Sequence, residues 1–209
     1  IPVYKRSDFL GRLMEDKIGI AIAGTHGKTS TTAMMAWTLT ELGQDPSFIV
    51  GGIINGMNVN AHAGLGETFV IEADEYDRMF LGLKPTIGII TNLEHDHPDI
   101  YPTVESFREA FADFIKLLPE NGLLIFCGDD EGAVEISQEA KVQKMSYGFG
   151  EGQVSAKNIR PNSRGGFDFT CNLPLVTCNL SLQAPGTHNV LNALAVMSVI
   201  SHLGYSLVD

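Results

Sequence analysis

The sequence predicts an α/β fold in which a mainly parallel sheet is flanked by helices, with a small antiparallel β-sheet subdomain near the C-terminal end. Apolar, strand-like runs alternate with helix-like segments over residues 18–127, as in parallel sheets with helical crossovers. A glycine-rich loop carrying a lysine follows the first of these runs. From about residue 145, short alternating runs separated by turn residues replace this rhythm.

The elements follow in order from local patterns. Apolar runs predict parallel strands at 18–23, 48–50, 69–73, 86–91 and 123–127. Apolar residues at helical spacing predict helices at 29–42, 103–118 and 189–203; Gly43 is placed to cap the first, and Pro119 ends the second. Short alternating runs predict antiparallel strands at 153–159, 167–171 and 176–182, within a small sheet covering about 145–184.

The last two of these strands predict a specific register. A hairpin that turns between Pro174 and Leu175 makes Cys171 and Cys178 direct cross-strand neighbours. Cross-strand β-carbons lie on the order of 5 Å apart, which is long for a relaxed disulfide of roughly 4 Å. We therefore expect two free thiols that pack as small apolar groups, and a hairpin of different register is the alternative.

Composition limits the function. The chain has 209 residues with 44% hydrophobic content, enough for a core of ordinary size. Fourteen basic against 25 acidic residues give a formal charge of −11, which disfavours nucleic acid because no basic patch displaces counterions. No apolar run is long enough to span a bilayer, and three cysteines, an odd number, favour a reducing compartment. We expect a cytoplasmic protein without nucleic-acid or membrane partners.

The loop after the first strand predicts a phosphate site. Residues 18–30 read IGIAIAGTHGKTS, an apolar run followed by two glycines, a lysine and hydroxyls at a helix start. Amides at a helix N-terminus and the Lys28 ammonium bind anions, and the Thr29 hydroxyl can reach a magnesium ion. The Walker pattern GxxxxGK(S/T) would place glycine at position 22, where isoleucine stands. The segment suits a nucleoside triphosphate and a P-loop-type sheet, with a ligand-free turn as the alternative.

Two further polar motifs follow predicted strands, EADEYD at 72–77 and NLEHDH at 92–97. In an open parallel sheet, ligands bind beyond the carboxyl ends of the strands, where the loop of Lys28 also lies. We therefore expect the three motifs to converge. A carboxylate and an imidazole can complete magnesium coordination there, although imidazole is an unusual ligand for so hard a cation. A solvated acidic loop and a surface turn before Pro98 are the alternatives.

A fourth motif, APGTHNVLNALAVMSVI, opens the last helix. Asn189 and Asn192 lie one turn apart on a single helix face, where two amides can read the edge of a base. Asparagine near a helix start is also common capping chemistry, and Thr187 or His188 can cap this helix. The residues alone leave both interpretations open.

Together the motifs resemble the central ATP-binding domain of the Mur ligase family: AGTHGKTSTTAMMA, VIEADEYDRMF, TNLEHDHPDIY and APGTHNVLNALAV, in that order. These ligases are cytoplasmic amide-forming enzymes of peptidoglycan precursor synthesis. GTHGKT is the family's shortened Walker motif, so Ile22 does not count against a phosphate site. The resemblance covers nearly the whole chain and implies ATP as a substrate and Mg²⁺ as the cofactor.

The resemblance also implies roles for individual residues. It places the ATP phosphates on Gly24, Thr25, His26, Gly27, Lys28, Thr29 and Ser30. It implies metal coordination by Thr29, Glu72 and His97, and catalysis by Lys28, Glu72 and His97. It places the adenine on His188, Asn189 and Asn192. The UDP-sugar substrate is placed near Asn60 and His62, although the family more often has arginine near His62.

Within the family, the histidine of the loop, the EADE sequence and the opening IPVYKRSDFLGRLM resemble the alanine-adding branch. Several relatives carry a carbamylated lysine in the helix after the DH motif, whereas residues 98–115 contain no lysine, which fits that branch. The resemblance thus implies ATP, UDP-N-acetylmuramate and L-alanine as substrates. The lactyl carboxylate would take the terminal phosphate of ATP, and L-alanine would attack the acyl phosphate. No side-chain nucleophile is required.

The resemblance further implies the middle part of a three-domain enzyme. Residues 1–17 would be a linker from an N-terminal UDP-binding domain, 18–204 the central domain, and 205–209 the start of a linker to a C-terminal domain. On this expectation the chain alone is inactive. The alternatives are a ligase of cell-wall recycling that adds a whole tripeptide, a folylpolyglutamate synthase-like ligase, which the loop histidine and the missing lysine disfavour, and a nucleotide-binding module without activity of its own.

Overall fold

The computed structural model of the protein describes residues 3–150 and 152–205; the ends of both predicted linkers, at 1–2 and 206–209, lie outside them. Ten strands form one sheet in the order β10-β9-β8-β7-β6-β5-β1-β4-β2-β3. Their bounds are β1 Ile18–Ala23, β2 Ser47–Ile54, β3 Val59–His62, β4 Thr68–Glu72, β5 Ile87–Ile90, β6 Leu123–Cys127, β7 Gln143–Gly148, β8 Val154–Pro161, β9 Phe167–Asn172 and β10 Thr177–Ser181.

The predicted fold class is confirmed, with one refinement. Strands β2, β4, β1, β5, β6, β7 and β8 pair in parallel, while β3 pairs antiparallel with β2, and β9 and β10 follow β8 antiparallel. The antiparallel strands are not a separate sheet, because Val154 and Ser155 of β8 pair with the end of β7 and so extend the main sheet. Within the range 145–184, β7 itself is parallel to β6.

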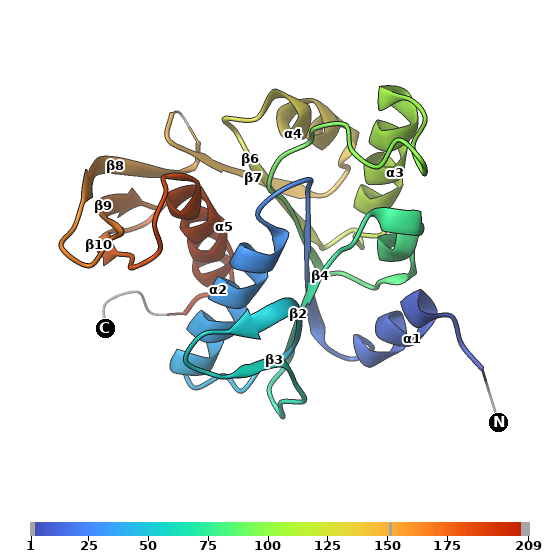
Figure 1. Ribbon diagram of the computed structural model, residues 1–209, viewed down its shortest axis with the longest axis horizontal. Helices are drawn as coiled ribbons and strands as arrows, with labels where there is room; N and C mark the ends of the chain where they lie inside the picture. The colour runs from blue at the N-terminus through green and yellow to red at the C-terminus, as the bar shows by residue number, and fades with distance from the viewer. Residues whose placement is uncertain (1–2, 151, 206–209) are drawn as a thin grey trace.

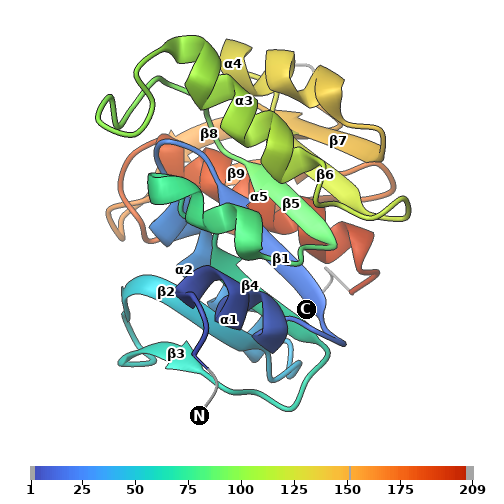
Figure 2. The same ribbon diagram turned by 90° about the vertical axis from the view of Figure 1, so that its right-hand side faces the viewer.

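Helices cover both faces of this sheet (Figures 1 and 2). Their bounds are α1 Arg6–Leu13, α2 Lys28–Glu41, α3 Val104–Ile115, α4 Glu131–Ile136 and α5 His188–His202, and a 3-10 segment, η1, spans Tyr76–Gly82. Helices α2 and α5 lie on one face, and α1, α3 and α4 lie on the other. Strand β1 is therefore covered on both sides, as its uninterrupted apolar run predicts.

Side-chain alternation along β1 divides the core into two parts. Ile20 and Ile22 pack with α2 and α5, whereas Ala21 and Ala23 pack with α3 and its neighbours. Residues on both sides of the strand are fully buried, which holds the loop that follows β1 in a fixed place between two helical layers.

The helix ends follow the sequence signals closely. Helix α2 begins after Gly27, which has φ +84°, and ends before Gly43, which has φ +71° and closes the last turn as predicted. Thr103 caps α3 through a hydrogen bond from the Ser106 amide. Helix α3 ends at Ile115, one turn before the predicted end at 118.

Four elements carry no clear sequence signal: α1, β3, α4 and β7. Helix α1 buries only Gly11, and every residue of β3 is exposed, so neither shows an amphipathic pattern.

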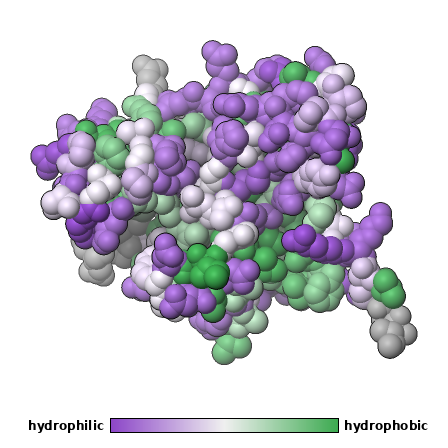
Figure 3. All heavy atoms as spheres, viewed as in Figure 1, coloured by the Kyte–Doolittle hydropathy of each residue, from purple (hydrophilic) through white to green (hydrophobic). Residues whose placement is uncertain are grey.

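In the view of Figure 3, hydrophobic surface gathers over β2, β3 and α1, while the surface over α3 and α4 is mostly hydrophilic. Across residues 3–150 and 152–205, no helix combines the length and apolar character needed to cross a membrane.

The predicted hairpin register is confirmed. Cys171 of β9 lies directly opposite Cys178 of β10, and the Leu173 amide donates to the Val176 carbonyl across the turn. Both cysteines are free thiols, and Cys171 is fully buried in the core beside Phe169.

Candidate functional site

The loop between β1 and α2 lies at the carboxyl ends of the parallel strands. Gly24 has φ +132°, and a Cβ there would lie 2.1 Å from the Thr91 hydroxyl, so only glycine fits. Gly27 then turns the chain into α2, whose first amides have no helical partners and face the loop. Thr29 and Ser30, on the first turn of α2, are exposed.

The segment after β5 supports this loop. The His26 amide donates to Asn92 Oδ1 at 2.8 Å, and the Thr91 hydroxyl donates to the His26 carbonyl at 2.6 Å. The Thr25 hydroxyl donates to the Glu94 carbonyl at 2.7 Å and accepts from the Glu94 amide. The motifs after β1 and β5 therefore converge, as predicted. The bracing roles of Thr91 and Asn92 were not predicted, because nothing in a single sequence distinguishes them from other polar residues at a strand end.

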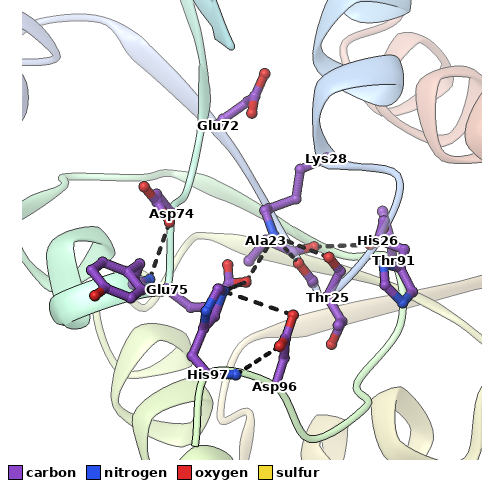
Figure 4. Close-up of polar contacts among 12 residues, drawn as sticks. Ala23, Thr25, His26, Lys28, Glu72, Asp74, Glu75, Thr91, Asp96 and His97 are labelled. Carbon is purple, nitrogen blue, oxygen red and sulfur yellow. Dashed lines mark hydrogen bonds and ion pairs between the residues drawn. The ribbon is translucent and has the colours of Figure 1, made fainter. Parts of the chain in front are cut away.

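The Lys28 ammonium has three acceptors (Figure 4). It donates to the carbonyls of Gly24 and Thr25, both within the loop, and to Glu75 Oε1 at 2.8 Å. Glu75 is only 1% exposed, so this ion pair is largely shielded from water. The sequence places both Glu72 and Glu75 at the end of a strand, and the resemblance gives a role to Glu72 alone; the lysine pairs with Glu75.

Glu72 contacts a different residue of the same loop. It ends β4, and its Oε2 accepts a hydrogen bond of 3.1 Å from the Thr29 hydroxyl. Its other oxygen accepts from the Gly51 amide of β2, and a Cβ on Gly51 would approach the carboxylate at 2.9 Å. Two predicted metal ligands, Thr29 and Glu72, are therefore neighbours.

His97, the third predicted metal ligand, lies beside other residues. Its Nε2 is 3.7 Å from Glu75 Oε1 and 3.7 Å from Asp96 Oδ2, and its ring packs edge-on against Tyr76. Within the described ranges no hydrogen bond or ion pair joins His97 to Thr29 or Glu72, and Figure 4 shows Glu72 apart from the group of Lys28, Glu75 and His97. Nor do these ranges contain three or more His, Cys, Asp or Glu residues grouped as a metal site.

The predicted adenine residues lie at the start of α5. Asn192 donates to Asn189 Oδ1 at 3.0 Å, and Asn189 donates to the Pro185 carbonyl at 2.7 Å and lies 3.2 Å from His188 Nε2. Neither Thr187 nor His188 makes a side-chain cap, so helix capping does not account for this motif. A Cβ on Gly27 would lie 2.9 Å from Asn192 Oδ1, which places α5 directly against the loop between β1 and α2.

The two residues predicted near the UDP-sugar lie elsewhere. Asn60 and His62 belong to β3, at the edge of the sheet and three strands from β1. His62 Nε2 is 2.9 Å from Asp45 Oδ1. A hydrogen bond from the Leu65 amide and, to a smaller extent, one from His62 hold the pKa of Asp45 below its usual value. The structure thus gives His62 a local partner and does not bring it to the loop.

Two hollows border the loop on opposite faces of the sheet. An apolar groove of about 690 Å³ runs from Thr29 and Ser30 past Asn189 to Trp37, between α2, α5 and β10. A smaller cavity of about 260 Å³ lies between α1, η1 and the ends of β2 and β4, and Arg6, Lys28 and Glu72 line it. Both hollows therefore open onto the first residues of α2.

A parallel sheet whose first strand leads through a glycine-rich loop into a helix defines a P-loop-type α/β domain, here with a lysine, a hydroxyl and two carboxylates at the loop. Residues 22–200 match the Mur ligase middle domain family, and the chain belongs to that family.

Curated relatives and solved structures agree with this assignment. A UDP-N-acetylmuramate–L-alanine ligase of Methylibium petroleiphilum is 41% identical over 209 residues, covering 97% of this chain and 45% of the relative. The chain therefore spans about 45% of the length of such a relative. The crystal structure of a UDP-N-acetylmuramate:L-alanyl-gamma-D-glutamyl-meso-diaminopimelate ligase from Neisseria meningitides has a TM-score of 0.83 and 28% identity, covering 95% of this chain and 65% of that one. The crystal structure of a UDP-N-acetylmuramate-alanine ligase from Thermotoga maritima has a TM-score of 0.79 and 29% identity, covering 97% of this chain and 45% of that one.

Proposed function

We propose that this chain is the ATP-binding part of an ATP-dependent amide ligase of peptidoglycan precursor synthesis, which joins L-alanine to UDP-N-acetylmuramate. The observation that carries the proposal is the meeting of Lys28, Thr29 and Glu72 at the carboxyl ends of β1 and β4. It is supported by the 41% identity to a ligase of that name. ATP, UDP-N-acetylmuramate and L-alanine are the proposed substrates.

The triphosphate of ATP is proposed to lie along the loop of residues 24–30. The free amides at the start of α2 and the Lys28 ammonium supply the positive charge that such a ligand needs. The apolar groove that begins at Thr29 and Ser30 is then the place for the adenine. Asn189 lines this groove, and its amide, with those of Asn192 and the neighbouring His188, offers polar partners for the edge of the base.

A magnesium ion is proposed as the cofactor, and the residues present suit it in part. Thr29 and Glu72 offer adjacent hydroxyl and carboxylate oxygens, which are the hard ligands that magnesium prefers. His97 has no direct contact with either in the described structure, so an ion held by all three would have to bridge the space between His97 and Glu72. When bound, the ion would neutralise charge on the phosphates.

The reaction requires positioning and charge neutralisation. A carboxylate oxygen of UDP-N-acetylmuramate attacks the terminal phosphorus of ATP, ADP leaves, and an acyl phosphate forms. The amine of L-alanine then attacks the acyl carbon, and inorganic phosphate leaves with formation of the amide. Lys28 stabilises the charge on the transferred group. The cavity bordered by Lys28, Glu72 and Arg6 would give the carboxylate of UDP-N-acetylmuramate access to the terminal phosphate of ATP.

The direct test uses the complete protein that the gene encodes. Phosphate release from ATP is expected only when UDP-N-acetylmuramate and L-alanine are both present, and Lys28→Met should abolish it. Phosphate release that does not depend on UDP-N-acetylmuramate and L-alanine would overturn the proposal.

ATP binding can be tested in the chain itself. Trp37 is the one tryptophan, is 40% exposed and lines the proposed adenine groove. Titration with ATP should change its fluorescence, whereas UDP should not, and the isolated chain should form no amide.

A ligase that adds a whole tripeptide is the second candidate, because the Neisseria structure named for that activity has a TM-score of 0.83. The two activities differ in the added group and share the ATP site. Giving the complete enzyme L-alanine or the tripeptide L-alanyl-γ-D-glutamyl-meso-diaminopimelate separates them. Activity with the tripeptide alone would replace the L-alanine proposal.

A further inference from the structure

Glu75 is a buried carboxylate that the proposed chemistry leaves without a role. It is 1% exposed, and its Oε1 accepts from the Lys28 ammonium at 2.8 Å. Its Oε2 is also buried and has no hydrogen-bond partner among the described residues. A buried carboxylate that loses its lysine partner is strongly unfavourable. The ion pair with Lys28 is therefore a contact that the protein has physical reason to keep.

One of the other contacts of Lys28, that with the Thr25 carbonyl, is easier to give up. An ammonium group has three donors, and all three are used, by Gly24, Thr25 and Glu75. A phosphate oxygen can accept from Lys28 only by replacing one of these acceptors. The Thr25 carbonyl, 3.2 Å from the ammonium, belongs to a partly exposed residue of the loop, so water can satisfy this oxygen after replacement, whereas Gly24 is buried. Glu75 is the acceptor whose replacement costs most.

Glu75 also joins the phosphate loop to the segment after β5. His97 Nε2 lies 3.7 Å from the same oxygen that holds Lys28. The Tyr101 hydroxyl donates to the backbone carbonyl of Glu75, and Tyr101 is fully buried. The position of Glu75 is therefore set by packing that does not depend on the loop, and Figure 4 shows the carboxylate between Lys28 and His97.

We propose that Glu75 is a positioning residue that acts through Lys28: it keeps the ammonium at the phosphate site while the Thr25 carbonyl is exchanged for a phosphate oxygen. The inference rests on the proposed ATP site and assigns to Glu75 a role separate from that of Glu72. Without the carboxylate, the Lys28 ammonium stays hydrogen-bonded to the loop carbonyls or to water, and only the contacts with ATP orient it toward the phosphates.

The test is a double-mutant cycle in the complete protein, with ATP affinity measured by calorimetry in excess Mg²⁺ and kcat and KM measured in the ligase assay. Glu75→Gln keeps the length of the side chain and removes its charge, and should weaken ATP binding roughly tenfold, the value of one charge-assisted hydrogen bond. In the Lys28→Met background the same change should have no further effect, because the group through which Glu75 acts is gone. Glu75→Asp, which keeps the charge but shortens its reach, should lose affinity to an intermediate extent.

Glu15→Gln is the matched control. It removes the charge from another Lys–Glu ion pair, which Glu15 makes with Lys84 at the end of β1 opposite the loop, where both side chains are more than half exposed, so it should leave ATP affinity within about twofold of wild type. Independent, multiplying effects of Lys28→Met and Glu75→Gln would overturn the inference, and so would wild-type affinity of Glu75→Gln or an equal loss in Glu15→Gln. If wild-type protein does not bind ATP, the proposed function itself fails, which is a distinguishable result.

Discussion

The Thr29 hydroxyl lies 3.1 Å from Glu72 Oε2, and the two residues come from separate parts of the chain. Thr29 stands on the first turn of α2, and Glu72 is the last residue of β4, the neighbour of β1 in the sheet. Their register follows from the parallel pairing, in which Ile22 lies opposite Glu72. This contact gives the proposed metal site two of its oxygen donors, and the first prediction tests it.

Replacing Glu72 should remove the dependence of nucleotide binding on magnesium. Glu72→Gln takes away the charge at a partly exposed strand end, so the fold should persist while ATP affinity in Mg²⁺ falls to the value in EDTA. Glu67→Gln is the control, because Glu67 is exposed and directly precedes the opposite end of β4. Calorimetry with and without Mg²⁺ measures both, and a metal dependence retained in Glu72→Gln would refute the assignment.

Two glycines that cap α2 should differ in their tolerance of alanine. Both have positive φ, +84° at Gly27 and +71° at Gly43, so alanine is strained at each by about 1–2 kcal/mol. A Cβ at Gly27 would also lie 2.9 Å from Asn192 Oδ1, whereas nothing lies within 4 Å at Gly43. Gly27→Ala should therefore be the more destabilising in urea unfolding and should weaken ATP binding. Equal stability losses would mean that α5 does not press on the loop.

The Lys28–Glu75 pair should show strong coupling in stability, without any ligand. Lys28→Met leaves a carboxylate that is 1% exposed without its cation, and should lower Tm on the order of 10 °C. Adding Glu75→Gln to this variant should recover much of the loss, because the uncompensated charge is removed. Differential scanning calorimetry of the single and double variants checks this. A double variant less stable than Lys28→Met would contradict the pairing.

Alkaline pH should destabilise the protein through buried thiols and a buried phenol. Burial raises the pKa of Cys171 to about 12, that of Cys127 to about 11 and that of Tyr101 to about 12. These groups hold protons more tightly in the folded state than in the unfolded state. Their contribution is complete below the unfolded pKa values and is lost as pH rises from about 9 towards 12.

Urea unfolding at pH 8, 9, 10 and 11 measures this loss, which amounts to about 1.4 kcal/mol per pH unit for each proton released on unfolding. Cys171→Ala should be less stable than wild type at pH 8, since it leaves a small void, and should show a shallower alkaline slope. An unchanged slope in this variant would mean that the Cys171 thiol does not titrate on unfolding.

Much of the fold follows from patterns that are local in the chain. The apolar run at 18–23 predicts a strand buried on both faces, and the glycine and lysine spacing after it predicts the loop and the start of α2, because each depends on neighbouring residues. Alternation likewise predicts the pairing of Cys171 with Cys178 across a short hairpin. The weakly patterned elements, β7 and α1 among them, form through contacts with distant segments and were not predicted.

The sequence by itself determined that a glycine-rich loop with a lysine stands at the carboxyl end of a parallel sheet, since the strand, the loop and the start of the helix are consecutive in the chain. Only the tertiary structure decided that the Lys28 ammonium pairs with Glu75 and not with Glu72. Glu72 and Glu75 are three residues apart and chemically alike, yet one meets Thr29 and the other meets Lys28. That choice depends on contacts between segments 43 and 47 residues apart, and on burial that closes over Glu75 and leaves Glu72 partly exposed. No local periodicity encodes it.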